Sequence, residues 1–462
     1  MSTDKKMSLV KSQLTSSTKK GFNGVKKLIP KKLFDSYHKS LALGSKLAYL
    51  NPSEKMIVIG VTGTNGKSTT VMMIARILEE ADHRVGATST VLFKIADREW
   101  LNDKKMTMLG RNELQKILRD MVVAGCQYAV VETSSEGIKQ HRHLGINYDV
   151  AVFTNLTSEH IESHGSFENY KKAKEQLFAK LKQDQHKIIR GQKIEKVIVA
   201  NCDDEYIKDF MKYSADAKYG FGIKGKSRDG ELKAKVETDN IIFGDHGVSF
   251  DIYDLKINLK LFGQFNVYNA LASITVAQSQ GIDISICKSA LEKIESIPGR
   301  MEFINEGQNF KVLVDYAPEP ESLRQLYDGI LKHNLVDHSH KIIHVLGSCG
   351  GGRDRDRRPV LGRLAASHSD YVIITNEDPY DDDPMEIINE VAKGAEDGGK
   401  ELNKNLFKIL DRREAIQRAI SLADESDLVL LTGKGCEQAI VVKNGQKIPW
   451  DERQVAREIL KK

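Results

Sequence analysis

The sequence has few of the residues that cross-link small or secreted proteins. Its five cysteines are scattered over 462 residues, and no two of them stand in a CxxC spacing. A disulfide framework or a zinc cluster is therefore not indicated. The chain also lacks a run of 18 apolar residues and the apolar segment of a secretory signal. We accordingly expect a protein of the cytoplasm.

Charge of one sign is concentrated at one end of the chain. Residues 1–50 hold eleven lysines against Asp4 and Asp35, a net charge of +9, although the whole chain carries only +5. The basic character is thus a property of the N-terminus, and we expect no nucleic-acid partner for the body of the protein. The overall content of 29% charged and 40% apolar residues is typical of a globular protein.

Residues 1–50 are expected to form a basic tail and a short helical segment. Residues 1–20 contain too few large apolar side chains to bury a core. Residues 21–50 mix lysines with Leu, Ile and Phe at irregular helical spacing. Two interpretations stay open: a short helix packed on the next domain, or a peripheral contact with anionic lipid headgroups.

The remaining length predicts two domains in which strands alternate with helices. Short apolar runs typical of strands stand at 56–60, 128–133, 148–156 and 197–201, and again at 311–316, 341–347, 371–375 and 427–433. Such alternation is typical of parallel βαβ units. We predict an α/β protein with a central P-loop ATPase domain on a parallel sheet (51–298) and a Rossmann-like α/β domain (299–462).

A phosphate-binding loop is predicted at GVTGTNGKST (60–69), between an apolar strand and an amphipathic helix. Gly63 and Gly66 let successive backbone N–H groups face one anion. Lys67 can reach the β- and γ-phosphates, and Ser68 offers a hydroxyl to Mg²⁺. The loop itself does not choose among GTPases, kinases, ATPases and ligases, although no NKxD-type guanine reader is found in this domain.

Six segments, which follow one another in a fixed order, indicate which of these enzyme classes the chain belongs to. They are GTNGKS (63–68), VETSSEG (131–137), TNLTSEHIESHG (154–165), YKKAKEQLF (170–178), FGQFNVYNALAS (262–273), and PGRME (298–302) followed by VDYAPEPESL (314–323). Together they resemble the motifs of the Mur ligase family, from about residue 56 to the end of the chain. The resemblance implies an ATP-dependent, ADP-forming amide ligase that uses ATP and Mg²⁺.

The resemblance also implies roles for single residues. The implied ATP contacts are Gly63, Thr64, Asn65, Gly66, Lys67, Ser68 and Thr69 at the phosphates, Asn266 at the adenine, Arg300 at the phosphates and Asp315 at the ribose. The implied metal ligands are Ser68, Glu132, His160 and Lys174, and Lys67, Glu132, His160, Lys174 and Arg300 form the implied catalytic set.

Two of the implied ligands have a plain physical meaning. Glu132 ends a strand beside the loop, where its carboxylate can share the Mg²⁺ held by Ser68. Lys174 would otherwise be a surface lysine on its helix. By resemblance it is carbamylated, which turns a cation into a carboxylate-like ligand.

The implied reaction has two steps. The acceptor's carboxylate attacks the γ-phosphate to give an acyl phosphate and ADP, and an amine then attacks the carbonyl. Because two anions meet in the first step, two Mg²⁺ ions, Lys67 and Arg300 would offset their repulsion. Closure of the two domains would assemble the centre and expel water.

Further segments resemble the family members that add the third residue of the cell-wall peptide. They are GSCGGGRDRDRRPVLG (347–362), GKGCEQ (433–438) and WDERQVARE (450–458). The implied reaction adds an amino acid to the D-Glu carboxylate of a UDP-N-acetylmuramoyl-dipeptide. Implied substrate contacts are Ser134, Arg142, Arg353, Glu377, Asp378, Gly433 and Glu437. The arginine cluster Arg353, Arg355, Arg357 and Arg358 is interpreted as an anion-facing loop or, alternatively, as an exposed charge run.

The sequence departs from the family pattern in three places. EDPY (377–380) replaces the diaminopimelate signature D-N-P-R, which removes a bidentate partner for a second substrate carboxylate. The acidic residues at 377, 378 and 381–383 favour an amine-bearing side chain such as that of lysine. Pro318 stands where the family has histidine. The stretch before the loop is shorter than the domain that usually holds UDP.

The third departure opens a second hypothesis, a Mur-type ligase for a non-UDP acceptor: a lipid-linked precursor, a poly-γ-glutamate-like chain or a pseudopeptidoglycan peptide. A third hypothesis, a non-catalytic nucleotide-binding module, conflicts with the intact set of Lys67, Ser68, Glu132, His160 and Lys174. The expected partners are a precursor-peptide or small-molecule acceptor and a free amino acid, and the enzyme is expected to be a monomer.

Overall fold

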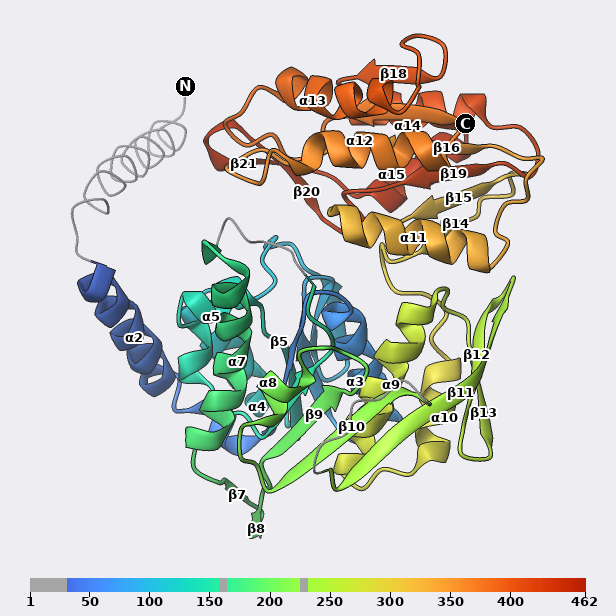
Figure 1. The fold of residues 1–462 in the computed structure, drawn as a ribbon. Coiled ribbons are helices and arrows are strands. Elements are labelled where there is room, and N and C mark those ends of the chain that lie inside the picture. Colours follow the sequence, from blue (N-terminus) through green and yellow to red (C-terminus); the bar gives the residue numbers. More distant parts are fainter. Residues whose placement is uncertain (1–30, 158–163, 225–231) are drawn as a thin grey trace.

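The chain folds into two units that lie against each other (Figure 1). The computed structural model describes residues 31–157, 164–224 and 232–462, with side chains from His38 onward. A central unit is built on an eleven-stranded sheet and a C-terminal unit on a six-stranded sheet. The predicted α/β class, with a parallel sheet in each unit, is confirmed.

The central sheet is parallel in its middle and antiparallel at both ends. Its order is β13-β12-β11-β10-β9-β6-β1-β5-β2-β3-β4. The parallel part consists of β1 (Ile57–Thr62), β2 (Val85–Thr88), β5 (Tyr128–Glu132), β6 (Val150–Phe153), β9 (Val197–Asn201), β10 (Ala217–Ile223) and β11 (Ala234–Gly244). The antiparallel ends are β3 (Leu92–Ile95) and β4 (Arg98–Leu101), and β12 (Gly247–Ile252) and β13 (Leu255–Leu259). The sequence predicted β1, β5, β6 and β9, but none of the strands between residues 217 and 259.

Helices cover both faces of this sheet, as a buried parallel sheet requires. One face is covered by α3 (Lys67–Glu80), α9 (Gln264–Ser279) and α10 (Ile284–Glu292), and the other by α4 (Arg111–Val123) and α7 (Phe167–Gln183). On β1, Ile59 and Val61 pack towards α3 and α9, whereas Val58 packs towards α4 and α7. Because both faces of β1 are buried, its sequence is one continuous apolar run. Shorter elements of this unit are α5 (Ser135–Lys139), α8 (Ile207–Met211), η1 (Pro52–Lys55), η2 (Arg142–Gly145) and the hairpin β7 (Ile188–Ile189) and β8 (Gln192–Lys193).

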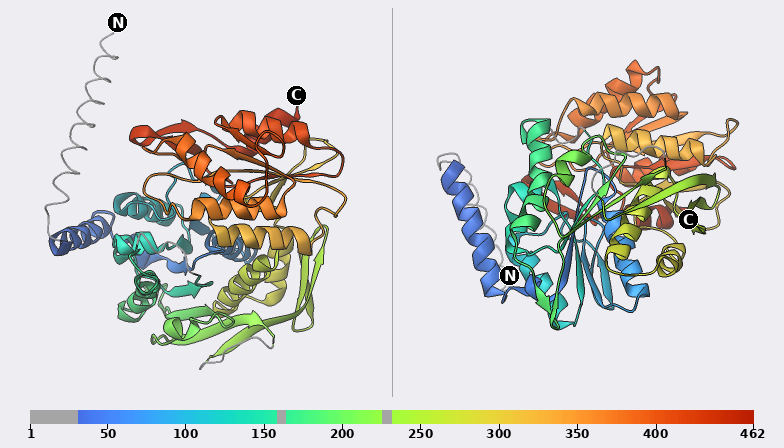
Figure 2. Two further views of the ribbon diagram at one scale, coloured as in Figure 1. Left: turned by 45° about the horizontal axis from the view of Figure 1, so that its top comes forward. Right: turned by 60° about the horizontal axis from the view of Figure 1, so that its bottom comes forward.

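Helix α2 (Lys31–Ala48) lies along the flank of the central unit (Figures 1 and 2). It packs on α4 and η2 through Ala42 and Ser45, which are buried. Leu43 and Leu47 lie on its exposed side. Of the two interpretations of the N-terminal segment, the structure shows the packed helix for this part. No helix among the described residues is both long and apolar enough to cross a membrane.

The C-terminal unit has the strand order β14-β15-β19-β16-β17-β18. Its strands are β14 (Glu302–Ile304), β15 (Lys311–Val314), β16 (Ile342–Leu346), β17 (Tyr371–Thr375), β18 (Leu406–Ile409) and β19 (Leu428–Leu431), and β14 alone pairs antiparallel. One face carries α11 (Pro320–Lys332), α12 (Arg357–His368) and α13 (Pro384–Asp397), and the other α14 (Arg412–Leu422) and α15 (Glu452–Leu460). A hairpin of β20 (Ala439–Val442) and β21 (Gln446–Pro449) projects from it, with η3 (Lys443–Gly445) at its turn.

A histidine joins the two units near the chain crossover. The Gly263 N–H donates to His333 Nε2 at 2.7 Å, so the ring carries its proton on Nδ1 and donates it to the Gly244 carbonyl at 2.8 Å. Burial lowers the pKa of His333, which favours this neutral form. The end of α11 is thereby tied to the central unit on both sides of the ring.

A second histidine makes the C-terminal unit sensitive to acid. His344 on β16 is fully buried between the hydroxyls of Tyr327 (2.7 Å from Nδ1) and Thr432 (2.8 Å from Nε2). Burial lowers the pKa of His344 from 6.5 to about 3. The unfolded chain therefore takes up a proton below pH 6.5 that the folded chain excludes. The neutral, buried His344 therefore contributes to the free energy of unfolding in full above pH 6.5. This contribution is lost as the pH falls from 6.5 towards 3.

We therefore expect a His344→Asn variant to be less stable at pH 7 but less sensitive to acid. Between pH 7 and pH 5 its unfolding free energy should fall by about 2 kcal/mol less than that of the parent. Urea unfolding followed by Trp450 fluorescence, in a Trp100→Phe background for both proteins, measures the difference. Equal losses in the two proteins would contradict the assignment.

Candidate active site

The loop between β1 and α3 is shaped by two neighbouring segments. A Cβ at Gly63 would lie 1.9 Å from Thr154 Oγ1, and one at Gly66, whose φ is +79°, would lie 2.2 Å from Asn269 Oδ1. The Asn65 N–H donates to Asn155 Oδ1 at 2.8 Å, and Thr154 Oγ1 donates to the Asn65 carbonyl at 2.8 Å. Glycine is needed at both loop positions because the side chain of Thr154, directly after β6, and that of Asn269 on α9 fill the space.

The predicted phosphate contacts meet at the start of α3. The helix begins at Lys67, and Gly66 is its N-cap. Its first N–H groups have no partner within the helix, which makes this end suited to an anion. The Lys67 ammonium donates to the Thr64 carbonyl at 2.7 Å, so its charge lies over the loop. Ser68 and Thr69 are buried in the first turn.

Glu132 ends β5 beside this loop and is 1% exposed. Ser68 Oγ donates to its Oε2 at 2.8 Å. Thr90, from the loop after β2, gives the same carboxylate its backbone N–H at 2.6 Å and its hydroxyl at 3.1 Å. The structure thus brings together two of the predicted metal ligands. Thr90 was missed, because it belongs to none of the recognised motifs.

The other two predicted metal ligands differ in what the structure shows. His160 lies outside the described residues. Lys174, on α7, is 1% exposed, donates to the Gly63 carbonyl at 2.5 Å and lies 4.5 Å from the Tyr170 ring centroid. The interpretation of Lys174 as a surface lysine is therefore wrong. Among the residues with described side chains, no group of three or more His, Cys, Asp and Glu residues is placed to hold a metal ion.

The C-terminal unit brings further predicted nucleotide contacts to the junction. Ser322, on α11, approaches the phosphate loop, with its Oγ 3.5 Å from Asn65 Oδ1. Asp315 follows β15 and accepts the N–H groups of Met301 and Ala317 at 2.8 Å each. Burial raises the pKa of Asp315, and the positive charge of Arg300 opposes that rise. The guanidinium of Arg300 lies 4.6 Å from the centroid of the ring of Tyr316.

Asn266 is engaged with its own helix. Its Nδ2 donates to the Phe262 carbonyl at 2.7 Å, and its Oδ1 accepts from Asn269 Nδ2 at 3.0 Å. Asn269 in turn lies against Gly66 in the phosphate loop. The pair therefore connects the start of α9 to the loop, and the proposed adenine contact stays a prediction.

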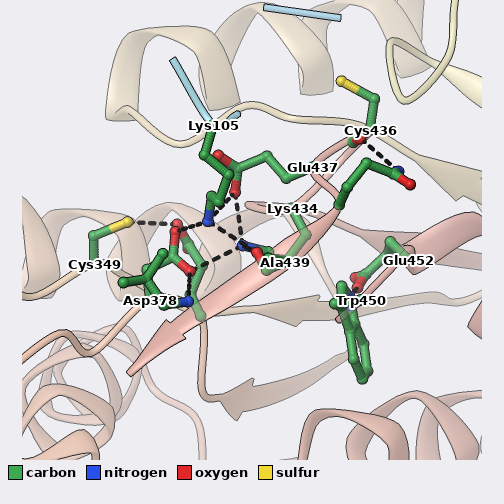
Figure 3. Close-up of polar contacts among 12 residues, drawn as sticks. Lys105, Cys349, Asp378, Lys434, Cys436, Glu437, Ala439, Trp450 and Glu452 are labelled. Carbon is green, nitrogen blue, oxygen red and sulfur yellow. Dashed lines mark hydrogen bonds and ion pairs between the residues drawn. The ribbon is translucent and has the colours of Figure 1, made fainter. Parts of the chain in front are cut away.

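Two predicted substrate contacts, Asp378 and Glu437, share a buried site with two lysines (Figure 3). Lys434 Nζ lies 3.1 Å from Asp378 Oδ1 and 2.6 Å from Glu437 Oε2. Lys105, from the loop after β4 in the central unit, lies 2.5 Å from Asp378 Oδ2 and 3.1 Å from Glu437 Oε2. Neither lysine was predicted. Lys434 stands within the recognised GKGCEQ segment, but no local pattern marks Lys105.

Glu377 and Gly433 meet at the same end of the C-terminal sheet. A Cβ at Gly433 would lie 2.5 Å from Glu377 Oε2. The Cys349 thiol donates to Glu377 Oε1 at 2.8 Å, and burial raises the pKa of both groups. Cys349 was not predicted to have a role, and here it is a direct partner of a predicted substrate residue.

The remaining predicted contacts are exposed or partly buried. Ser134 caps α5 by accepting the Gly137 N–H at 3.2 Å. Arg142 donates to Gln140 Oε1 at 2.7 Å and to the Met108 carbonyl. Arg353 is exposed in the loop after β16.

The arginine cluster of this loop needs a correction. The side chain of Arg357 is 5% exposed and pairs with Glu319, and that of Arg358 is 2% exposed and pairs with Glu390 at 2.6 Å. These two arginines begin α12 and are buried among carboxylates. They therefore form neither an exposed charge run nor an anion-facing loop.

Comparisons with known proteins agree with this geometry. Residues 61–277 match the family model described as Mur ligase middle domain, and residues 299–435 match Mur ligase, glutamate ligase domain. The UDP-N-acetylmuramoyl-L-alanyl-D-glutamate--2,6-diaminopimelate ligase of Clostridium tetani is 36% identical over 424 residues, 91% of this chain and 81% of the relative. The UDP-N-acetylmuramyl-tripeptide synthetase of a Roseiflexus species is 37% identical over 420 residues, 89% of this chain and 80% of the relative.

A solved structure of a UDP-N-acetylmuramoyl-L-alanyl-D-glutamate--2,6-diaminopimelate ligase superposes with a TM-score of 0.56 at 28% identity, covering 88% of this chain and 78% of that one. The chain therefore belongs to the Mur ligase family, whose members are ATP-dependent, ADP-forming amide ligases. Its relatives include a UDP-N-acetylmuramyl-tripeptide synthetase, which confirms the predicted resemblance to the members of the family that add the third residue.

The contact between Gly66 and Asn269 yields a test of the loop. A Gly66→Ala variant would place its methyl group against Asn269 and strain a positive φ, so its affinity for ATP should fall by about tenfold or more. Titration calorimetry measures the affinity.

Gly191→Ala is the matched control, because Gly191 has a φ of +81° but no heavy atom within 4 Å of an added Cβ. ATP affinity that is unchanged in Gly66→Ala would refute the loop geometry.

Proposed function

We propose that this chain joins a diamino acid to the D-Glu carboxylate of UDP-N-acetylmuramoyl-L-Ala-D-Glu and cleaves ATP to ADP and phosphate. The observation that carries the proposal is the junction itself. A phosphate loop with a buried Ser68–Glu132 pair faces, across the contact between Asn65 and Ser322, a unit that holds buried carboxylates. The names of relatives that align with about nine-tenths of the chain supply the acceptor.

The reaction would proceed through an acyl phosphate. An oxygen of the acceptor carboxylate attacks the γ-phosphorus, and the bond from that phosphorus to ADP breaks. The amine nitrogen of the amino acid then attacks the acyl carbon, the phosphate leaves with its bonding electrons, and the nitrogen loses a proton. Lys67 and Arg300 supply positive charge where the carboxylate and the phosphates approach each other.

The ATP site would combine both units. The backbone from Gly63 to Thr69 would hold the phosphates, Asn266 the adenine and Asp315 the ribose. Residues 51–298 would then act as the ATP-binding domain, and residues 299–462 as the domain that presents the amino acid. This division explains why Arg300 and Asp315 stand directly after the crossover between the units.

The donor set at the loop fits Mg²⁺. Ser68 and Glu132 would hold one ion, because a hydroxyl and a buried carboxylate are the oxygen donors that Mg²⁺ prefers and they already lie 2.8 Å apart. His160 and a carbamylated Lys174 would hold a second. Bound Mg²⁺ would neutralise charge on the phosphates.

The amino acid and the acceptor would enter from different sides. Asp378, Glu437, Glu377, Gly433 and Arg353 would surround the amino acid, and Ser134 and Arg142 would contact the acceptor. The buried carboxylate of Asp378 and the partly buried carboxylate of Glu437 favour a substrate whose side chain carries an amine. Both lysine and diaminopimelate meet this condition.

The setting of the enzyme follows from its substrates. We propose that it acts as a monomer in the cytoplasm, where ATP is available. The net charge of +9 on residues 1–50 and the exposed leucines of α2 support a peripheral contact with anionic lipid.

The function is tested by phosphate release from Mg-ATP with UDP-N-acetylmuramoyl-L-Ala-D-Glu and, in turn, lysine, ornithine, diaminopimelate and norleucine. We expect turnover with one of the diamino acids. Lys67→Ala should lower it about a thousandfold, because the charge over the loop is lost. Lys116→Ala, on an exposed face of α4, serves as the control. If the protein binds ATP but releases no phosphate with any of the amino acids, the hypothesis of an acceptor without UDP would be favoured instead.

The carbamate is tested separately. Lys174→Ala should be nearly inactive, and a short carboxylic acid should restore part of its activity by replacing the lost carboxylate-like ligand. Phosphate release in the presence of acetate or propionate measures the rescue. Activity that stays absent at all acid concentrations, in a variant that still binds ATP, would count against carbamylation.

A further inference from the structure

The acidic site holds two ammonium groups on one set of acceptors. Lys434 Nζ and Lys105 Nζ both contact the Asp378 carboxylate, Glu437 Oε2 and the Ala439 carbonyl. The Ala439 contacts measure 2.8 Å for Lys434 and 2.9 Å for Lys105. Both lysine side chains are buried, with 0% and 5% exposed. Two buried cations therefore share one set of acceptors, formed by two carboxylates and a carbonyl.

The charges of the four side chains in direct contact balance only when Lys105 is present. Two carboxylates, Asp378 and Glu437, face two lysines. Although burial acts to raise it, the pKa of Asp378 is lowered, because Lys434 and Lys105 favour its charged form. Without Lys105 the site would keep one negative charge in excess, and burial makes such a charge costly.

The two lysines belong to different units. Lys434 follows β19 in the same unit as Asp378 and Glu437, whereas Lys105 is separated from Asp378 by 273 residues and reaches it from the central unit. The loop of Lys105 touches the hairpin of β20 and β21 a second time, where Lys447 donates to the Lys104 carbonyl at 3.0 Å. Separation of the units would therefore withdraw Lys105 alone and leave the other three groups together.

The loop of Lys105 is also connected to the phosphate site. Thr107 Oγ1 lies 3.0 Å from Thr90 Oγ1, and Thr90 donates to Glu132, the partner of Ser68. The loop that carries Lys105 is therefore in hydrogen-bond contact with a residue that contacts the candidate Mg²⁺ site.

We propose that the ammonium of Lys105 and the side-chain amine of the incoming diamino acid are alternative occupants of one site, formed by Asp378, Glu437 and the Ala439 carbonyl. Lys105 is then a specificity-determining residue. A substrate amine enters only where it displaces this internal cation, and an amino acid without a side-chain amine gains nothing from the carboxylates. The proposal rests on the proposed function, because it concerns the amino acid that the ligase adds.

The test is the binding of L-lysine and L-norleucine to the full chain by titration calorimetry. Norleucine has the carbon chain of lysine without the side-chain amine. Lys105→Met removes the internal cation and keeps much of its apolar length. We expect Lys105→Met to bind L-lysine about tenfold or more tightly than the parent, and L-norleucine with nearly unchanged affinity.

The neighbouring Lys104→Met is the matched control, since the Lys104 side chain is exposed and pairs with Asp103. It should bind both amino acids as the parent does. Lys105→Gln, which keeps hydrogen-bond donors but no charge, provides a second variant if Lys105→Met unfolds, and it should show the same gain for L-lysine.

Three results would overturn the proposal: L-lysine affinity that is equal or weaker in the Lys105 variants, an equal gain for L-norleucine, or no binding of L-lysine to any of the proteins. A failure of the proposed function would be detected by a different experiment. It would appear as an absence of phosphate release with the UDP-linked acceptor, independently of the calorimetry.

Discussion

The register of three neighbouring parallel strands is the constraint on which the site depends. Val61 of β1 pairs with Glu132 of β5, and Thr62 of β1 pairs with Phe153 of β6. The three strands therefore end at the same level, and the residues that follow them meet. Ser68, Glu132 and the Thr154–Asn155 turn come together for this reason alone, although up to about 90 residues separate them. A shift of one residue in either pairing would turn Glu132 away from the loop.

The second organising feature is buried charge at the junction of the two units. Hydrophobic contact alone would hold the units in many relative positions, whereas ion pairs such as Lys105–Asp378 are satisfied in only one. His333, which bridges Gly263 and Gly244, adds a directional contact at the crossover. Of these contacts, the Lys105–Asp378 pair lies at the proposed amino-acid site. Joining the units and preparing that site are thus one physical event.

The sequence predicted the fold class and four parallel strands in each sheet, because apolar runs and glycine-rich turns are local signals. It did not predict the strands between residues 217 and 259, where exposed and buried residues mix on β11 and the periodicity is weak. Among the predicted site residues, Glu132 contacts Ser68 of the predicted phosphate loop, and Lys174 contacts Gly63 of the same loop. Thr90 and Lys105 were missed, since each acts through a contact distant in sequence. Arg357 and Arg358 were misplaced, because a run of charges does not reveal which of them are buried.

By itself, then, the sequence determined the α/β architecture, the glycine-rich loop between β1 and α3, and the membership of a ligase family. These properties reside in short segments whose backbone and side-chain chemistry act locally. Only the tertiary structure decided which groups share a carboxylate: Ser68 and Thr90 at Glu132, and Lys434 and Lys105 at Asp378. The physical reason is that burial and charge balance are properties of the whole packed arrangement. The environment of a lysine such as Lys105 is set by the carboxylates of the other unit, Asp378 and Glu437, and its own sequence neighbours do not reveal it.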